Sequence, residues 1–160
     1  MAALICALLL GLQGPQSPEL IDRTLAIVSG RTITLSDART VLAVGLVEGT
    51  SVDAALVQRL VDRELMLRET ERYQPAEPPR SQIDQRLAQA VERAGGEAAL
   101  AKLLAAGGFT PERLRAWIRD DLRIENYLGQ RFAADERRQD LVADWLSDLR
   151  RRTPITVFEP

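Results

Sequence analysis

Two strand-like segments lie at opposite ends of a chain whose pattern is otherwise helical. Residues 23–29 and 32–35 are rich in apolar and β-branched residues and flank a turn at Gly30 and Arg31, which predicts a β-hairpin. Residues 155–158 have the same character, and no other strand-like segment lies near them in the sequence. An isolated hairpin is marginally stable, and a lone strand leaves its backbone unpaired. We therefore predict that the terminal strand pairs with the hairpin and buries its apolar side chains, giving a mainly α fold with a small β-sheet.

Apolar residues recur at helical spacing through the sequence between these strands. Helix-start signals at Ser36, Ser51, Ser81 and Thr110, together with glycine and proline breaks, divide this part of the chain into helices. The predicted helices cover residues 36–49, 51–73, 81–94, 98–106, 110–128 and 135–151. In the last of them, the residues predicted to face inward are Leu141, Val142, Trp145, Leu146 and Leu149.

The first residues of the chain are typical of an export signal. Residues 2–10 form an almost unbroken apolar run, and small residues, glycine and proline follow it. The run is shorter than the ~20 apolar residues of a membrane span and fits a secretory signal peptide, although no basic residue precedes it. We predict a signal peptide over residues 1–18 and a single periplasmic domain over residues 19–160. An N-terminal core helix is the alternative interpretation.

The composition excludes several kinds of catalytic site. The chain has no histidine and one cysteine, Cys6, which removes Ser-His-Asp and Cys-His catalysis and most zinc sites. Its 21 basic and 23 acidic residues give a formal net charge of -2, which disfavours a dedicated nucleic-acid binder. We therefore predict that the protein is not an enzyme and has no catalytic residues, no cofactor and no metal ion.

Three acidic residues near the middle of a predicted helix are the strongest candidate cation site. Asp120, Asp121 and Glu125 lie within six positions of one another, with Arg119 and Arg123 between and beside them. Adjacent acids on a helix point in different directions, and flanking arginines are natural ion-pair partners. We interpret this segment as a solvated helix face.

Two further charged features have structural interpretations. Glu64 lies near the apolar face of its helix, where an ion pair with Arg68 is expected and a buried acid with a raised pKa is the alternative. Residues 150–152 are three arginines at the end of the last predicted helix, where cations suit the helix dipole without any ligand.

The order of several motifs resembles the SurA-type periplasmic chaperones. A hairpin that begins with an acid-arginine pair and contains an Ile-Thr pair comes first. A helix follows in which leucines flank an acid-Arg-Glu sequence. Next come a Gly-Gly break with a Thr-Pro-Glu helix start, and finally a C-terminal helix and strand. These motifs are residues 21–37, 60–67, 95–115, 145–150 and 155–158. Family members usually carry parvulin-type prolyl isomerase modules before the C-terminal strand, but only residues 129–134 are available here.

The resemblance implies a chaperone body without its isomerase. We expect ATP-independent binding of unfolded or exported polypeptides, outer-membrane proteins among them, with no nucleic-acid partner and no stable membrane insertion of the mature chain. Soft and aromatic side chains suit promiscuous apolar contacts, so the candidate client-binding residues are Met66, Phe109, Trp117, Tyr127 and Phe132. The main alternative is a non-catalytic structural or assembly subunit of an envelope complex with one dedicated partner. A prolyl isomerase and a cytoplasmic DNA-binding protein are less favoured.

Overall fold

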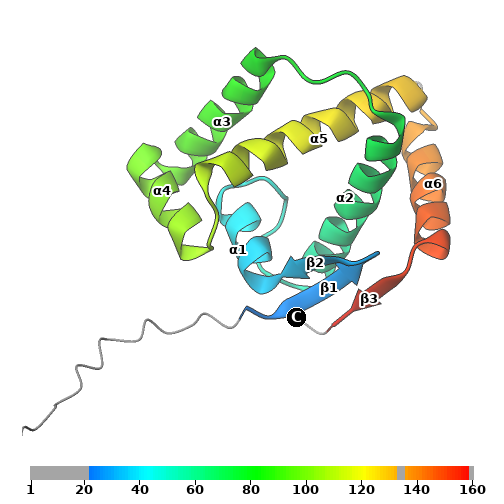
Figure 1. Cartoon of the computed structure of the whole chain (residues 1–160), viewed down its shortest axis with the longest axis horizontal. Coiled ribbons are helices and arrows are strands. Elements are labelled where there is room, and N and C mark those ends of the chain that lie inside the picture. The colour runs from blue at the N-terminus through cyan, green and yellow to red at the C-terminus, as the bar shows by residue number, and fades with distance from the viewer. Residues whose placement is uncertain (1–21, 133–135, 159–160) are drawn as a thin grey trace, which may run out of the picture.

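Six helices and a three-stranded antiparallel sheet make up the part of the chain that the computed structural model describes, residues 22–132 and 136–158 (Figure 1). The predicted fold class, mainly α with a small β-sheet, is confirmed. The predicted signal peptide over residues 1–18 lies outside the described residues. In chain order the elements are β1 (Thr24–Val28), β2 (Arg31–Thr34), α1 (Leu35–Ala43), α2 (Ala54–Tyr73), α3 (Arg80–Ala94), α4 (Glu97–Ala106), α5 (Pro111–Arg131), α6 (Arg138–Arg152) and β3 (Ile155–Val157).

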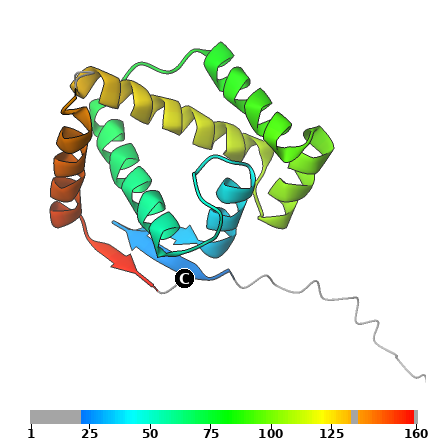
Figure 2. The ribbon, with the colours of Figure 1, turned by 180° about the vertical axis from the view of Figure 1, so that it is seen from behind.

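The sheet joins the two ends of the described chain. Its strand order is β2-β1-β3, and β3 runs antiparallel to β1. The Ser29 N–H donates to the Pro154 carbonyl at 2.8 Å, and the Phe158 N–H donates to the Leu25 carbonyl at 2.9 Å. The predicted pairing of the terminal strand with the hairpin is thus confirmed, with the central strand β1 as its partner. Both ribbon views show β3 beside β1 at the outer side of the sheet (Figures 1 and 2).

The hairpin turn lies one residue earlier than predicted. Ser29 and Gly30 occupy the turn with φ values of 48° and 90°, as a two-residue type I′ turn requires. A β-bulge interrupts the register between Thr24 and Ala26. Because a bulge adds one residue to a strand, Leu25 and Ala26 are both buried although they are adjacent.

The prediction that β3 buries all of its apolar side chains is wrong. Ile155 is half-buried against the core, whereas Val157 is 44% and Phe158 43% exposed. Val157 and Phe158 are exposed because β3 is a short strand at the edge of the sheet. The helices pack against the other two strands, α2 against β1 and α1 against β2.

Three of the predicted helix starts are displaced. The observed N-cap residues are Thr34, Asp53 and Pro79, in place of the predicted Ser36, Ser51 and Ser81. The Thr34 hydroxyl accepts from the Asp37 N–H at 3.2 Å, and the Asp53 carboxylate accepts from the Leu56 N–H at 2.8 Å. In these two cases a second capping residue nearby takes the position, whereas Pro79 precedes α3 without a side-chain cap bond. The start at Thr110 is confirmed, since its hydroxyl accepts from the Arg113 N–H and Pro111 opens the helix.

Helix α1 ends at Ala43, well before the predicted end near Gly49. The Gly45 N–H donates to the Leu42 carbonyl, and the Leu46 N–H turns back to the Val41 carbonyl at 2.8 Å. These bonds form a Schellman motif, which requires a residue of positive φ, and Gly45 supplies it with a φ of 69°.

Helix α2 is the centre of the fold. It packs against β1, α1, α5 and α6, and its buried apolar residues are Leu56, Val57, Leu60, Val61, Leu65 and Leu67. Helix α6 lies along α2 and buries Trp145 and Leu149. The prediction that Leu141 faces inward is wrong, because this side chain is exposed in the first turn of α6. Helices α3 and α4 lie beside α5, on the side of the molecule away from α6 (Figure 1).

Candidate functional site

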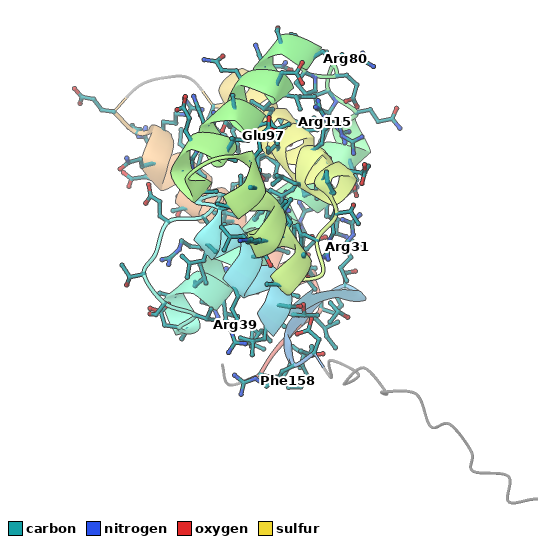
Figure 3. The ribbon with its side chains drawn as sticks, turned by 90° about the vertical axis from the view of Figure 1, so that its left-hand side faces the viewer. Arg31, Arg39, Arg80, Glu97, Arg115 and Phe158 are labelled. Carbon is teal, nitrogen blue, oxygen red and sulfur yellow. The ribbon has the colours of Figure 1, made fainter. Side chains whose placement is uncertain are left out.

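A groove between α3, α4 and α5 is the candidate site. Its volume is about 680 Å³, within the range of ligand-binding clefts. Figure 3 looks onto this side of the molecule and labels three charged residues of the groove, Arg80, Glu97 and Arg115. The apolar residues that line it are Ile83, Leu87, Val91, Leu100, Ala101, Leu104, Pro111, Leu114 and Ala116.

The groove floor follows from the spacing of apolar residues along α3. Ile83, Leu87 and Val91 recur every fourth position and therefore lie along one face of the helix. Leu100 and Leu104 do the same on α4, and both are buried. Leu87 and Val91 are only half-buried, so their apolar surface remains open to the groove.

Charges of both signs surround this apolar floor. The charged residues that line the groove are Arg80, Glu97, Glu112, Arg115 and Arg119. Arg115 donates to Asp84 of α3 at 2.6 Å, and Arg119 donates to the neighbouring Asp120 at 3.0 Å. The rim thus has no single charge sign, so it favours neither acidic nor basic ligands strongly.

A second pocket lies on the other side of α3, between the α1–α2 loop, α2, α3 and α5. Its volume is about 360 Å³, and Leu46, Val47 and Met66 contribute to its apolar wall. Four arginines line it, and three of them have acceptors within the protein. Arg63 donates to Asp121, and Arg86 donates to Glu125. Arg93 donates to the Gly45 carbonyl. The fourth arginine of the lining is Arg59.

Three consecutive charged residues of α2 join it to three different elements. Successive residues on a helix are rotated by about 100°, so they project in different directions. Asp62 pairs with Arg150 of α6 at 2.7 Å, Arg63 with Asp121 of α5 at 2.6 Å, and Glu64 with Arg31 of β2 at 3.2 Å. The acid-Arg-Glu motif of the sequence therefore has a structural role in this fold.

The predicted ion pair between Glu64 and Arg68 is wrong. Glu64 faces the hairpin and pairs with Arg31, whereas Arg68 is exposed. Burial raises the pKa of the Glu64 carboxyl above its ordinary value, and the positive charge of Arg31 opposes that shift. The alternative interpretation, a buried acid with a raised pKa, is therefore confirmed in direction.

The acidic residues of α5 do not form one solvated face as predicted. Asp121 faces α2, where burial raises the pKa of its carboxyl and the Arg63 guanidinium opposes the shift. Asp120 pairs with Arg119, and Glu125 pairs with an arginine of α3. Each carboxylate thus has its own cation, and within the described ranges no three Asp, Glu, His or Cys residues are placed to hold a metal ion.

The three arginines at the end of α6 are paired with carboxylates. Arg150 binds Asp62 and Arg152 binds Glu69, both on α2, while Arg151 binds Asp148 one turn earlier in its own helix. The prediction that these arginines need no ligand is consistent with this pairing, and two of them fasten α6 to α2.

The structure divides the five predicted client-binding residues among three places. Met66 lies in the pocket between α2, α3 and α5. Phe109 is buried beside Trp117, with ring centroids 6.3 Å apart. Tyr127 and Phe132 pack around Trp145 of α6, at centroid distances of 5.9 and 5.6 Å.

None of these five residues lines the groove between α3, α4 and α5. Leu87 and Val91 are not among the predicted site residues. The signal was present, since the large apolar side chains of α3, Ile83, Leu87 and Val91, all lie along one stripe. What the sequence did not reveal is that this stripe lies partly open beside α5.

Comparisons with known proteins do not assign the chain to a family. No protein-family model matches it, and no curated protein matches it either. The resemblance to SurA-type chaperones therefore stays a prediction based on the motifs described above. Among the helices that the structure describes, none is long and apolar enough to cross a membrane.

Proposed function

We propose that this protein binds unfolded polypeptides reversibly, without nucleotide and without covalent chemistry, in the groove between α3, α4 and α5. The observation that carries the proposal is the apolar floor of this groove, which leaves Leu87 and Val91 half-buried inside a rim of mixed charge. Soluble proteins use such apolar concavities to bind the apolar side chains of other molecules.

The mechanism is burial of apolar client side chains against the groove floor. A fully buried aliphatic side chain contributes about 1.5–3 kcal/mol, and ordering an unfolded client offsets part of that gain. Binding that depends on a few such side chains is weak and reversible, which is what a holding function needs. The mixed charges of the rim accept clients of either net charge.

We further propose that binding takes place in the cell envelope, with exported polypeptides as clients and outer-membrane proteins among them. Two sequence features support this location. They are the export-like run of residues 2–10 and the order of motifs that resembles SurA-type chaperones. The same resemblance supports a non-catalytic role, because the segment where relatives carry an isomerase module is a few residues long here.

The test is suppression of aggregation of an unfolded β-barrel protein by the purified chain. Wild type should slow aggregation at near-stoichiometric ratio without nucleotide, and Leu87→Asp should lose most of this effect because it places a charge on the groove floor. Gln85→Asp is the matched control, since this exposed residue of α3 lies outside the groove and receives the same charge. Equal activity of the two variants would exclude the groove as the binding site.

Two further measurements separate the alternatives. The protein should not accelerate cis/trans exchange in a proline-containing tetrapeptide, and clear acceleration would contradict the non-catalytic proposal. If several unrelated clients all aggregate unhindered while one envelope protein binds stoichiometrically, the dedicated-partner function replaces the general one.

A further inference from the structure

The outer edge of β3 has backbone groups that no other strand in the described sheet pairs with. In the antiparallel ladder with β1, the bonds at Ser29–Pro154 and Leu25–Phe158 show which β3 residues face β1. Backbone groups alternate sides along a strand, so the N–H and C=O groups of Ile155 and Val157 point away from the sheet. Since β3 is last in the order β2-β1-β3, these groups form an open edge.

The proline of this segment does not protect that edge. Proline lacks an N–H and often blocks an exposed edge against further pairing. Here Pro154 faces β1, where its carbonyl accepts from Ser29, so the missing N–H is on the inner side. The outward N–H groups of Ile155 and Val157 therefore remain available.

The opposite edge of the sheet is protected in a different way. Strand β2 carries Arg31, which pairs with Glu64 and Glu71 of α2, and the chain enters α1 directly after Thr34. Charged side chains and an early end of the strand are common protections of edge strands. Strand β3 is also short, but none of its three residues is charged.

Exposed apolar surface coincides with the open edge. Val157 and Phe158 are two of the four large apolar residues that are exposed in the described part of the chain, and they are adjacent. Phe158 lies at the end of the molecule remote from α3, as Figure 3 shows. The same short segment thus combines unpaired backbone groups with exposed apolar side chains.

We propose that the open edge of β3 binds an extended polypeptide segment, which adds a fourth strand to the sheet in the order β2-β1-β3-client. The outward groups require a partner with an extended, unpaired backbone, and the exposed Val157 favours apolar residues at alternate positions. The source of the segment rests on the proposed function, because an unfolded β-barrel client supplies such segments. This site is distinct from the groove and selects backbone conformation, whereas the groove selects apolar side chains.

The test uses a fluorescent synthetic peptide of alternating valine and threonine residues, N-methylated along one of its two edges so that it cannot aggregate. Its free edge should bind the full-length protein, and a peptide methylated on both edges should not. Val157→Pro removes an outward N–H but no bond to β1, so it should weaken binding at least about tenfold while the melting temperature stays close to that of wild type. Val157→Lys, which keeps the N–H and adds a charge to the edge, should weaken binding as well.

A direct readout is hydrogen exchange of single amides. Protection of the Ile155 and Val157 amides should rise when the peptide binds, while the Thr156 amide, which faces β1, should change little. The groove variant Leu87→Asp should bind the peptide as wild type does.

The outcomes separate this inference from the proposed function. If Leu87→Asp abolishes peptide binding and Val157→Pro does not, the edge proposal is overturned and the groove proposal stands. Failure of wild type to bind the one-edge peptide also overturns the edge proposal, and aggregation suppression then decides the function by itself. A concentration-dependent dimer that Val157→Pro dissociates would show that a second copy of the chain occupies the edge, which likewise overturns the proposal.

Discussion

Helices α2 and α3 are both long, yet the protein holds them in very different ways. Helix α2 has eight buried residues among its 20, and ion pairs connect it to β2, α5 and α6. Helix α3 has two buried residues among its 15, Ile83 and Ala90, and its ion pairs with α5 are exposed. Both hollows described above, the groove and the arginine-lined pocket, have α3 as one wall.

This difference separates the region that stabilises the fold from the region where we propose binding. Close packing around α2 leaves little apolar surface exposed, but it stabilises the fold. The loose packing of α3 contributes less stability, and the apolar surface it leaves open is what a ligand can cover. Mutations can therefore test the two regions independently.

The largest expected effect comes from truncating a leucine in the core. Leu65→Ala in α2 should lower the free energy of unfolding by about 2–5 kcal/mol, because Leu65 is 1% exposed and leaves a cavity. Leu87→Ala in α3 is the matched change and should cost about 1 kcal/mol or less, because that side chain is half-buried beside an open groove. Urea titration measures both values, and equal losses would remove the distinction between the two helices.

Removing the residues after Arg152 tests whether the stability of the α2 region depends on the pairing of β3 with β1. The truncation removes the ladder bonds with β1 and the partly buried Ile155, which together should cost about 2–4 kcal/mol. Exposure of Val157 and Phe158 keeps the loss below that of three fully buried side chains. Thermal unfolding measures the change, and an unaltered melting temperature would show that β3 contributes nothing to stability.

The ion pairs of the two helices provide a smaller contrast. Arg63→Met leaves the half-buried Asp121 without its partner and should cost about 2 kcal/mol. Arg86→Met breaks an exposed pair between α3 and Glu125 and should cost about 0.5 kcal/mol or less. Chemical denaturation at low and high salt checks this prediction, since only the exposed pair should also lose its contribution in salt.

The smallest expected effect is a pH dependence that originates at Glu64. Its pKa is raised in the folded state, so the folded chain binds a proton more readily than the unfolded chain does. This contribution to stability is complete below the unfolded pKa and is lost as pH rises through the folded pKa. Glu64→Gln removes this titration. The free energy of unfolding of the variant, relative to that of wild type, should therefore rise by at most about 1 kcal/mol as pH rises from about 4 toward neutral. A constant difference in the free energy of unfolding between the two proteins across that pH range would contradict the assignment of the pH dependence to Glu64.

Local signals in the sequence predicted most of the fold, and long-range contacts account for the rest. The hairpin, the glycine breaks and the start at Thr110 depend on neighbouring residues, so periodicity and capping preferences were sufficient. The cap predicted at Ser36 is wrong because Thr34, two positions earlier, is equally able to cap. The pairing of β3 was predictable because a lone strand needs a partner.

The candidate site was less predictable than the fold. Aromatic side chains such as Tyr127 and Phe109 suit both a core and a binding surface, and their packing depends on which helices meet. The pair between Arg63 and Asp121 joins residues 58 positions apart, and no local pattern reveals it. The exposure of the Leu87 side chain likewise depends on the distance between α3 and α5. The spacing of apolar residues along one helix does not determine that distance.

The pairing of β3 with β1 also sets the order in which a newly made chain can fold. Strands β1 and β2 leave the ribosome early and can form their hairpin at once. The second edge of β1, at Leu25 and Ser29, has no partner until residues 154–158 emerge. Until that moment the nascent protein exposes an unpaired strand edge, which is prone to pair with other chains. Synthesis of residues 154–158 therefore pairs the edge of the central strand β1 and leaves the edge of the three-residue strand β3 in its place.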